Sequence, residues 1–184
     1  MKRDHISSTE LLTGLTDELF CEGYTVKGTF KFPRIPNAKG ELTPFARFDT
    51  DAAFELICDW HFNINKVTGV RWRAFPEIFE KNRKTPTPLH YHALFKPVKE
   101  AKFLKVAQRK WINLLRHRYP RCTLPTKPLW LDIIERSEPS SQKAIEAYSI
   151  KQQDDYWNSI NALRSDCLYA HNESEGVTRF QKVA

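Results

Sequence analysis

Two histidines separated by one residue carry the strongest chemical signal in this sequence. His90 and His92 lie within residues 89–95, where apolar side chains alternate in the way that predicts a β-strand. Side chains two apart on a strand point to the same face, so both imidazoles stand together while Tyr91 turns away. Imidazoles held side by side on a rigid strand are frequent metal ligands. The spacing therefore predicts half of a metal site.

A glutamate on the preceding predicted strand can complete this site. Folding residues 70–79 back on the histidine strand as a hairpin sets Glu77 opposite His90. A divalent ion such as Mg²⁺ or Mn²⁺ prefers oxygen ligands beside imidazole. Glu77 is thus the predicted third ligand. Glu80 is a reserve candidate, which reaches the histidine side of the sheet only if Pro76 makes a bulge. An ordinary solvated glutamate is the alternative for both.

A tyrosine and a lysine further along the chain supply a possible nucleophile and a cation. Tyr148 and Lys151 follow Pro139-Ser140-Ser141, a sequence that introduces a helix, and positions three apart share one helix face. An ammonium beside a phenol favours its ionised, nucleophilic form. Simple packing of the tyrosine is the alternative.

The two motifs, in this order and setting, resemble those of the HUH endonucleases. His90-Tyr91-His92 looks like the family's His-hydrophobic-His signature, and Tyr148-Ser149-Ile150-Lys151 matches the Tyr-x-x-Lys motif of single-tyrosine rolling-circle replication initiators. The resemblance covers about residues 24–152. It implies a metal that polarises the scissile phosphate, and attack by Tyr148 to give a 5′-phosphotyrosine and a free 3′-hydroxyl.

The same resemblance implies partners and a biological setting. The substrate would be a single-stranded or hairpin DNA origin of a phage or plasmid in a bacterial cell. No G-x-x-x-x-G-K-[ST] motif occurs in the sequence, so a separate helicase is expected to unwind the DNA. A relaxase or a transposase uses the same chemistry, and the sequence leaves that choice open.

Charge also predicts a nucleic-acid partner. The net charge is +7, yet residues 96–127 alone hold ten Lys/Arg and one acid, or +9, which leaves −2 for the rest. Some of these cations fall along one side of a predicted helix over residues 99–118, and two further arginines lie on the strand over residues 70–79. The expected DNA contacts are Lys102, Lys105, Arg109, Arg116, Arg71 and Arg73. A solvated helix face is the alternative.

The order of predicted elements indicates the fold class. Helices alternate with strands of antiparallel type, which predicts an α+β fold: an antiparallel sheet of about four to five strands with packed helices, of the ferredoxin-like or HUH nuclease kind. The expected helices cover residues 8–22, 52–65, 99–118, a segment bearing Tyr148, and a segment from Tyr156 to Leu163; the expected strands cover residues 24–32, 70–79, 89–95 and 129–136.

One domain is expected over residues 1–184, with a core at about 24–152 and a C-terminal helix and tail over 153–184. The four cysteines are far apart and form no C-x-x-C pair, which is typical of reduced thiols in a cytoplasmic protein. No apolar leader or membrane-spanning run occurs, so no membrane contact is expected.

Two alternatives of other classes remain at this point. A non-catalytic DNA-binding repressor module would use the same basic helix, and a metal-dependent hydrolase would use the histidines without a protein-linked product. Among the other histidines, only His61 is worth checking as a further ligand.

Overall fold

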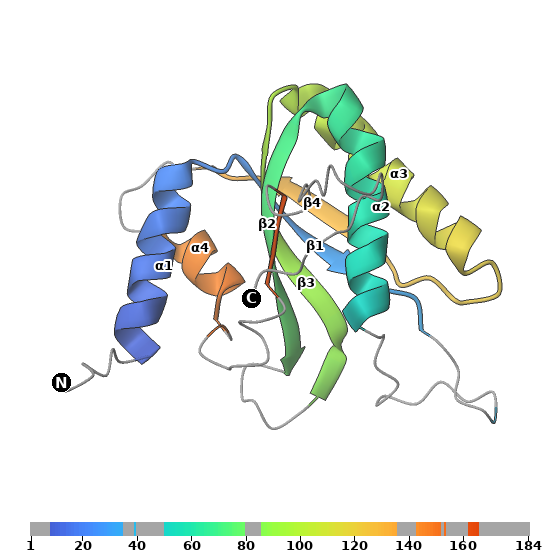
Figure 1. Ribbon diagram of the computed structural model, residues 1–184, viewed down its shortest axis with the longest axis horizontal. Helices are drawn as coiled ribbons and strands as arrows, with labels where there is room; N and C mark the ends of the chain where they lie inside the picture. Colours follow the sequence, from blue (N-terminus) through green and yellow to red (C-terminus); the bar gives the residue numbers. More distant parts are fainter. Residues whose placement is uncertain are drawn as a thin grey trace, which may run out of the picture.

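The computed structural model describes residues 8–34, 39, 50–79, 86–135, 143–151, 153 and 162–165. It has an α+β fold, in which four helices pack on a five-stranded antiparallel sheet of order β4-β1-β3-β2-β5 (Figure 1). This confirms the predicted fold class. In chain order the elements are α1 Ser8–Glu22, β1 Val26–Lys31, α2 Thr50–Thr68, β2 Val70–Phe79, β3 Pro86–Pro97, α3 Glu100–Arg118, β4 Leu129–Ile133, α4 Ala144–Ser149 and β5 Leu163–Arg164.

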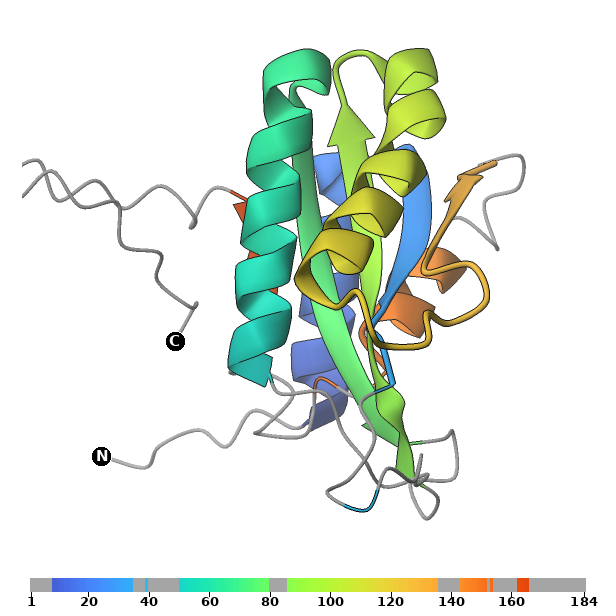
Figure 2. The same cartoon turned by 90° about the vertical axis from the view of Figure 1, so that its right-hand side faces the viewer.

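Helices α2 and α3 cover one face of the sheet, and Figure 2 shows them side by side in front of the strands. Phe30 of β1 is fully buried between Trp60 of α2 and Trp111 of α3, with ring centroids 5.0 Å and 4.9 Å away in edge-on contacts. Each buried aromatic side chain contributes about 2 to 3 kcal/mol, as an upper estimate. This packing makes the central strands a rigid support.

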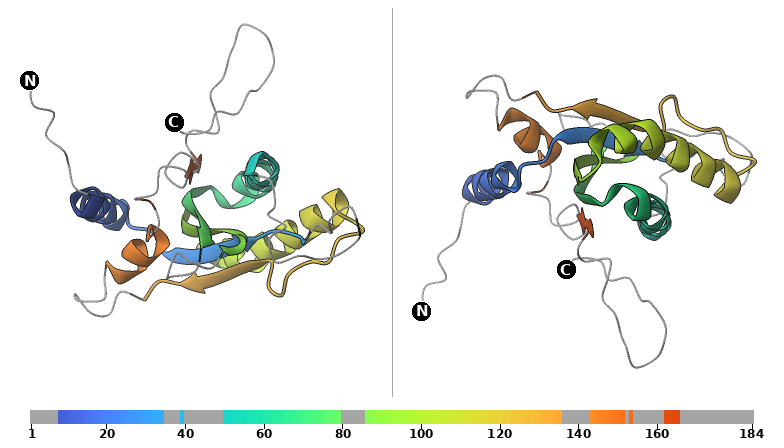
Figure 3. Two further views of the ribbon diagram at one scale, coloured as in Figure 1. Left: turned by 90° about the horizontal axis from the view of Figure 1, so that it is seen from below. Right: turned by 90° about the horizontal axis from the view of Figure 1, so that it is seen from above.

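Helices α1 and α4 lie on the opposite face, as the views along the sheet show (Figure 3). A second apolar cluster forms there, in which Leu19 and Ile150 from the helical side meet Phe75 and Leu94 of the sheet. Phe75 and Leu94 belong to the same alternation as Glu77 and the histidines. The histidine face of β3 is therefore the face that carries α4.

The β2–β3 hairpin has the register that the sequence predicts. Glu77 lies directly opposite His90, and the register shifts between Glu77 and Phe79. A proline within a strand requires an edge position or a bulge because it has no amide hydrogen. Accordingly, β5 pairs only with Arg73 and Ala74 on the other side of β2. The residues next to Pro76 on that side belong to no described strand pair.

Two predicted elements differ from the structure. Leu163 was expected in a packed helix but lies in β5, where it pairs with Ala74. A long-range partner, the open edge of β2, overrides the local helical pattern. β4 ends at Ile133 instead of residue 136, although the N–H of Ile134 still donates to Thr25 O. Tyr156, Trp157, Ile160 and the tail lie outside the described residues.

Two further features concern the described part of the chain as a whole. No helix in it is long and apolar enough to cross a membrane. Cys21, Cys58 and Cys122 are free thiols, and burial raises the pKa of Cys58 to about 12.

Candidate active site

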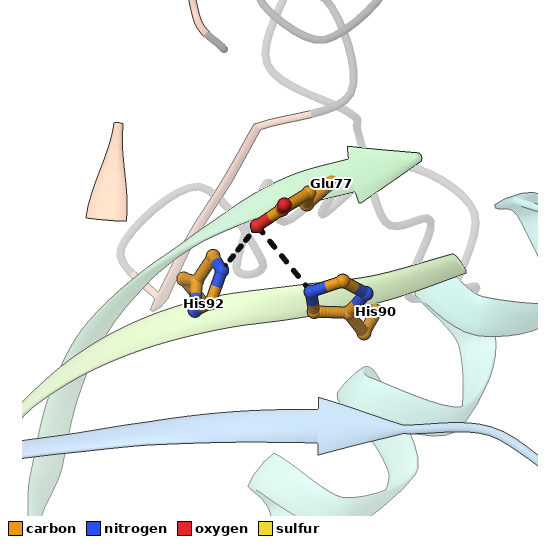
Figure 4. A group of neighbouring side chains, drawn as sticks. All are labelled: Glu77, His90 and His92. Atoms are coloured by element: carbon orange, nitrogen blue, oxygen red, sulfur yellow. Dashed lines mark hydrogen bonds and ion pairs between the residues drawn. The ribbon is translucent and has the colours of Figure 1, made fainter. Parts of the chain in front are cut away.

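Three side chains from two neighbouring strands converge on one point. The Oε2 atom of Glu77 lies 2.5 Å from Nε2 of His92 and 3.4 Å from Nε2 of His90 (Figure 4). One ligand atom from each residue falls within 4.8 Å of the other two. The group can therefore hold a metal ion, and it brings together the two histidines and the predicted third ligand. Glu80, the reserve ligand, lies outside the described residues.

A backbone contact fixes the orientation of His90. Its Nδ1 lies 3.0 Å from the carbonyl oxygen of Pro88. A carbonyl can only accept, so Nδ1 carries the hydrogen and Nε2 is the atom turned toward Glu77. Metal-binding histidines are commonly held in this way by a carbonyl behind the ring. The donor set therefore fits a metal ion.

The protonation states of the group also suit metal binding. Burial alone would raise the pKa of Glu77, but its close contacts with His90, His92 and Lys151 outweigh burial and hold that pKa well below its usual range. Burial lowers the pKa of His92, although the hydrogen bond with Glu77 opposes this shift. Near pH 7 the carboxylate is ionised and this imidazole is neutral, which are the forms that bind a metal.

Lys151 joins the same group through Glu77. Its Nζ atom lies 2.9 Å from Glu77 Oε2 and 4.1 Å from the ring centroid of Tyr148. Burial would lower the pKa of Lys151, but hydrogen bonds with Glu77 and Tyr148 outweigh it and raise the pKa, so the ammonium stays charged. Lys151 thus links the acid to the phenol.

The route by which Lys151 reaches Tyr148 differs from the prediction of a shared helix face. Helix α4 ends at Ser149, and Lys151 lies in the turn after it. Ile150, only 1% exposed, anchors this turn in the apolar cluster beneath α4. Burial of that one side chain, which local helical spacing does not include, stops the helix and directs the lysine to Glu77.

Tyr148 is both close to the histidines and open to solvent. Its ring centroid lies 5.0 Å from that of His92, in an edge-on arrangement. The side chain is 58% exposed, among the most exposed large apolar residues in the described part of the chain. This exposure does not fit the alternative in which the tyrosine packs in the core.

A groove of about 680 Å³ lies beside the two histidines, on the side of β1. Thr29 and Lys31 of β1 lie directly opposite His92 and His90. The described lining also includes Arg34, Thr87 and Thr123. Sequence reasoning missed Lys31 because the local pattern of β1 does not reveal that the strand pairs with β3. It missed Arg34 because this residue follows β1 and forms a bridge with the distant Thr123.

The structure places the other predicted DNA contacts away from this group. Lys102, Lys105, Arg109 and Arg116 are exposed on α3, which packs on the opposite face of the sheet. Arg71 is also exposed, at the far end of β2.

Arg73 and His61 have structural contacts. Arg73 pairs through Nη1 with Glu18 Oε1 at 2.7 Å and Glu22 Oε1 at 3.0 Å. His61 accepts a hydrogen bond at Nδ1 from Trp72 Nε1, at 2.9 Å, in the core beneath α2. Burial lowers the pKa of His61 to about 4. His61 therefore lies in the packing on the other face and does not join the metal group.

No known family model, curated protein or solved structure matches the chain. Function is therefore inferred from the geometry of the site.

Proposed function

We propose that the chain is a metal-dependent nickase of the HUH type, which cuts and rejoins single-stranded DNA through Tyr148. One observation carries the proposal: an exposed tyrosine, a charged lysine and a Glu-His-His group meet on one sheet face. In this reading, the enzyme starts rolling-circle replication at a phage or plasmid origin in the bacterial cytoplasm, with a separate helicase. Relaxases and transposases share this chemistry.

The proposed reaction is a phosphoryl transfer without net hydrolysis. A Mg²⁺ or Mn²⁺ ion held by Glu77, His90 and His92 would polarise the scissile phosphate and offset the charge that grows on it. Tyr148 loses its proton to water and Lys151 stabilises the phenolate. The phenolate oxygen forms a bond to phosphorus, the P–O3′ bond breaks, and the departing oxygen takes a proton from water. A 3′-hydroxyl can reverse the attack, so the energy of the bond is kept for rejoining.

The groove beside the histidines supports a path for the substrate strand. Attacking and leaving oxygens lie roughly in line in phosphoryl transfer. Tyr148 and Lys151 are not among the described residues that line the groove, whereas both histidines are. We therefore place the nucleotide that carries the leaving 3′-oxygen in the groove, across the histidine pair from Tyr148. Lys31 and Arg34 supply cations for its phosphates.

A covalent-adduct assay tests the proposal. The protein is mixed with 5′- and 3′-labelled single-stranded origin DNA and Mn²⁺, then separated on a denaturing gel. We expect a protein-linked band that carries the 3′ segment of the DNA, lost in Tyr148→Phe and in EDTA. Tyr119→Phe, which alters a partly buried tyrosine after α3, is the matched control and keeps the band.

The same gel separates the alternatives. Cut DNA without a protein-linked band would support the metal-dependent hydrolase. Binding without cutting on any origin tested would support a repressor module, for which the exposed basic side of α3 is the favouring observation. Either result would overturn the nickase proposal.

A further inference from the structure

Trp130 is a partly exposed tryptophan on the sheet face that carries the metal group. It lies on β4 directly opposite Thr29 of β1, and on its other side Thr29 lies directly opposite His92. β1 lies between β3 and β4 in the sheet (Figure 1). Residues directly opposite in an antiparallel pair point to one face, so His92, Thr29 and Trp130 form one row across the strands.

The indole of Trp130 is not part of the core. Trp60, Trp72 and Trp111 are each at most 1% exposed, and all three belong to the apolar cluster beneath α2 and α3. Trp130 is partly exposed and belongs to neither apolar cluster of the described residues. Folding therefore gains less from this side chain than from the other three, and a ligand can reach its ring.

Two neighbours hold this indole in position. Lys27 Nζ lies 5.6 Å from the centroid of the Trp130 ring, a cation–π contact, and 3.5 Å from Asp132 Oδ2. Lys27 and Asp132 lie directly opposite each other on β1 and β4. The carboxylate offsets the charge of the ammonium, so this pair attracts phosphate only weakly. Trp130 therefore offers a ligand an oriented aromatic surface and little charge.

The charge that a nucleic acid needs lies next to this surface. Lys31 follows Thr29 by two residues on β1 and so points to the same face, and Arg34 lies beyond it. Both line the groove of about 680 Å³ that Thr29 and His92 also line. Proteins that bind single strands combine cations along the path of the backbone with aromatic rings on which bases stack. Trp130 and these two cations form that combination.

We propose that Trp130 is the stacking surface for one base of the single-stranded DNA. Two strand spacings of about 4.8 Å place Trp130 about 10 Å from His92. A stacked strand rises about 3.4 Å per nucleotide, so this distance spans about three nucleotides, and fewer in an extended strand. The groove and Trp130 lie on the same side of the histidines, the side of β1.

This position assigns the stacked base to the 5′ segment of the cut strand, an assignment that rests on the proposed nickase function. That function places the leaving 3′-oxygen in the groove, and the segment that ends in this oxygen continues toward Trp130. Stacking keeps the released 3′-hydroxyl strand near the metal group after the cut. A strand that is held in place rejoins more readily than one that has diffused away. The stacking itself does not depend on cleavage.

A binding experiment on the full chain in EDTA tests the stacking without chemistry. Short oligo(dA) and an abasic strand of the same length and charge are labelled and followed by fluorescence anisotropy. We expect Trp130→Leu to bind oligo(dA) about tenfold more weakly, because the base–aromatic contact is lost, and to bind the abasic strand within about twofold of wild type. The slope of log K against log[salt] should stay unchanged in Trp130→Leu and become smaller in Lys31→Gln.

Two further variants separate stacking from a general loss of apolar surface. Trp130→Phe keeps an aromatic ring and should bind oligo(dA) within about threefold of wild type. Ile133→Ala is the matched control, since it removes an apolar side chain, 49% exposed, from the other face of the same strand. It should not change the binding of either strand. Unchanged oligo(dA) binding by Trp130→Leu, or wild-type protein that binds both strands equally, would overturn the proposal.

Tryptophan emission gives a second measurement, which does not depend on the folding of Trp130→Leu. A base that stacks on an indole quenches its fluorescence, so oligo(dA) should lower the emission of the wild type and the abasic strand should not. The quenching should disappear in Trp130→Phe, which still binds oligo(dA). Quenching of equal size in Trp130→Phe would mean that another tryptophan contacts the base, and the assignment to Trp130 would be wrong.

Failure of this site and failure of the proposed function give different results. Wild-type protein that forms no DNA adduct, while Trp130→Leu loses base-dependent binding, would overturn the nickase and leave the stacking surface standing. Once the adduct has formed, a strand with a free 3′-hydroxyl is added to measure rejoining. We expect Trp130→Leu to need about tenfold more of this strand for half-maximal rejoining. An equal requirement in both proteins would overturn the assignment to the 5′ segment.

Discussion

At the scale of single residues, Lys151 is the cation that balances the buried acid. Glu77 has only 6% of its side chain exposed, and Lys151 contacts it at 2.9 Å. We expect Lys151→Met to lower the free energy of unfolding in EDTA by about 1 kcal/mol, since the carboxylate loses a charged donor and a quarter of the lysine, 24%, is exposed. Urea unfolding measures the change. Lys143→Met, which breaks an exposed pair with Asp17, should leave stability nearly unchanged, and an equal loss would contradict this account.

The metal ligands give a second residue-scale prediction. We expect His90→Ala, His92→Ala and Glu77→Gln each to weaken Mn²⁺ binding by more than about tenfold, because each removes one of the converging ligand atoms. Isothermal titration calorimetry measures the affinity, and His117→Ala on the exposed side of α3 is the control.

Nicking should disappear in both histidine variants while DNA binding stays largely intact. Loss of DNA binding to the same extent would contradict that division of labour.

At the scale of elements, the sequence predicted the strand faces, which depend on local alternation, and the hairpin register, which depends on a short connection. The pattern of β3 predicted the shared face of the histidines, and hairpin folding predicted Glu77 opposite His90, which the register confirms. Lys31 and the strand at Leu163 could not be predicted, because their pairing joins segments far apart in sequence. The turn that carries Lys151 depends on burial of Ile150, which helical spacing does not encode.

The close approach of β1 to its neighbours gives an element-scale prediction. A Cβ at Gly28 would lie 2.6 Å from the carbonyl oxygen of Trp130 in β4, so the backbone would have to move. We expect Gly28→Ala to lower the free energy of unfolding by about 2 kcal/mol. Gly14→Ala in α1 has nothing within 4 Å of the new atom and should instead raise it by about 1 kcal/mol. Urea unfolding of both variants tests the contrast, and stabilisation by Gly28→Ala would show the strands to be less tightly packed.

The contact between α2 and β2 predicts a pH dependence of stability. Burial lowers the folded-state pKa of His61 from 6.5 to about 4, so between these values the unfolded chain binds the extra proton. The contribution of His61 to the free energy of unfolding is fully present above pH 6.5. It should fall by about 3 kcal/mol as the pH drops to 4.

Urea unfolding across this pH range compares the wild type with His61→Gln, whose amide oxygen can still accept from Trp72 Nε1. Other titrating groups are common to both proteins, so the difference isolates His61. Parallel curves would mean that His61 is protonated equally in the folded and unfolded chain.

At the scale of the whole molecule, the sheet separates the metal group from the basic side of α3. The metal group lies on the face with α1 and α4, while Lys105 and Arg109 are exposed on α3 behind the other face. We expect Lys105→Gln/Arg109→Gln to leave the rate of adduct formation on a short single strand within about twofold of wild type, because such a strand need not pass around the sheet. A quenched-flow adduct assay measures the rate. A large loss would mean that α3 contacts the cut strand itself.

The position of Pro76 has a consequence for self-association. The N–H of Val98 donates to Gly69 O, so odd-numbered residues of β2 bond to β3 and even-numbered ones turn their nitrogens outward. Pro76 is even-numbered and has no amide hydrogen, so an incoming strand would find a missing donor there. A second copy that added a strand to β2 at this point would lose one ladder hydrogen bond, so Pro76 disfavours edge-to-edge pairing there.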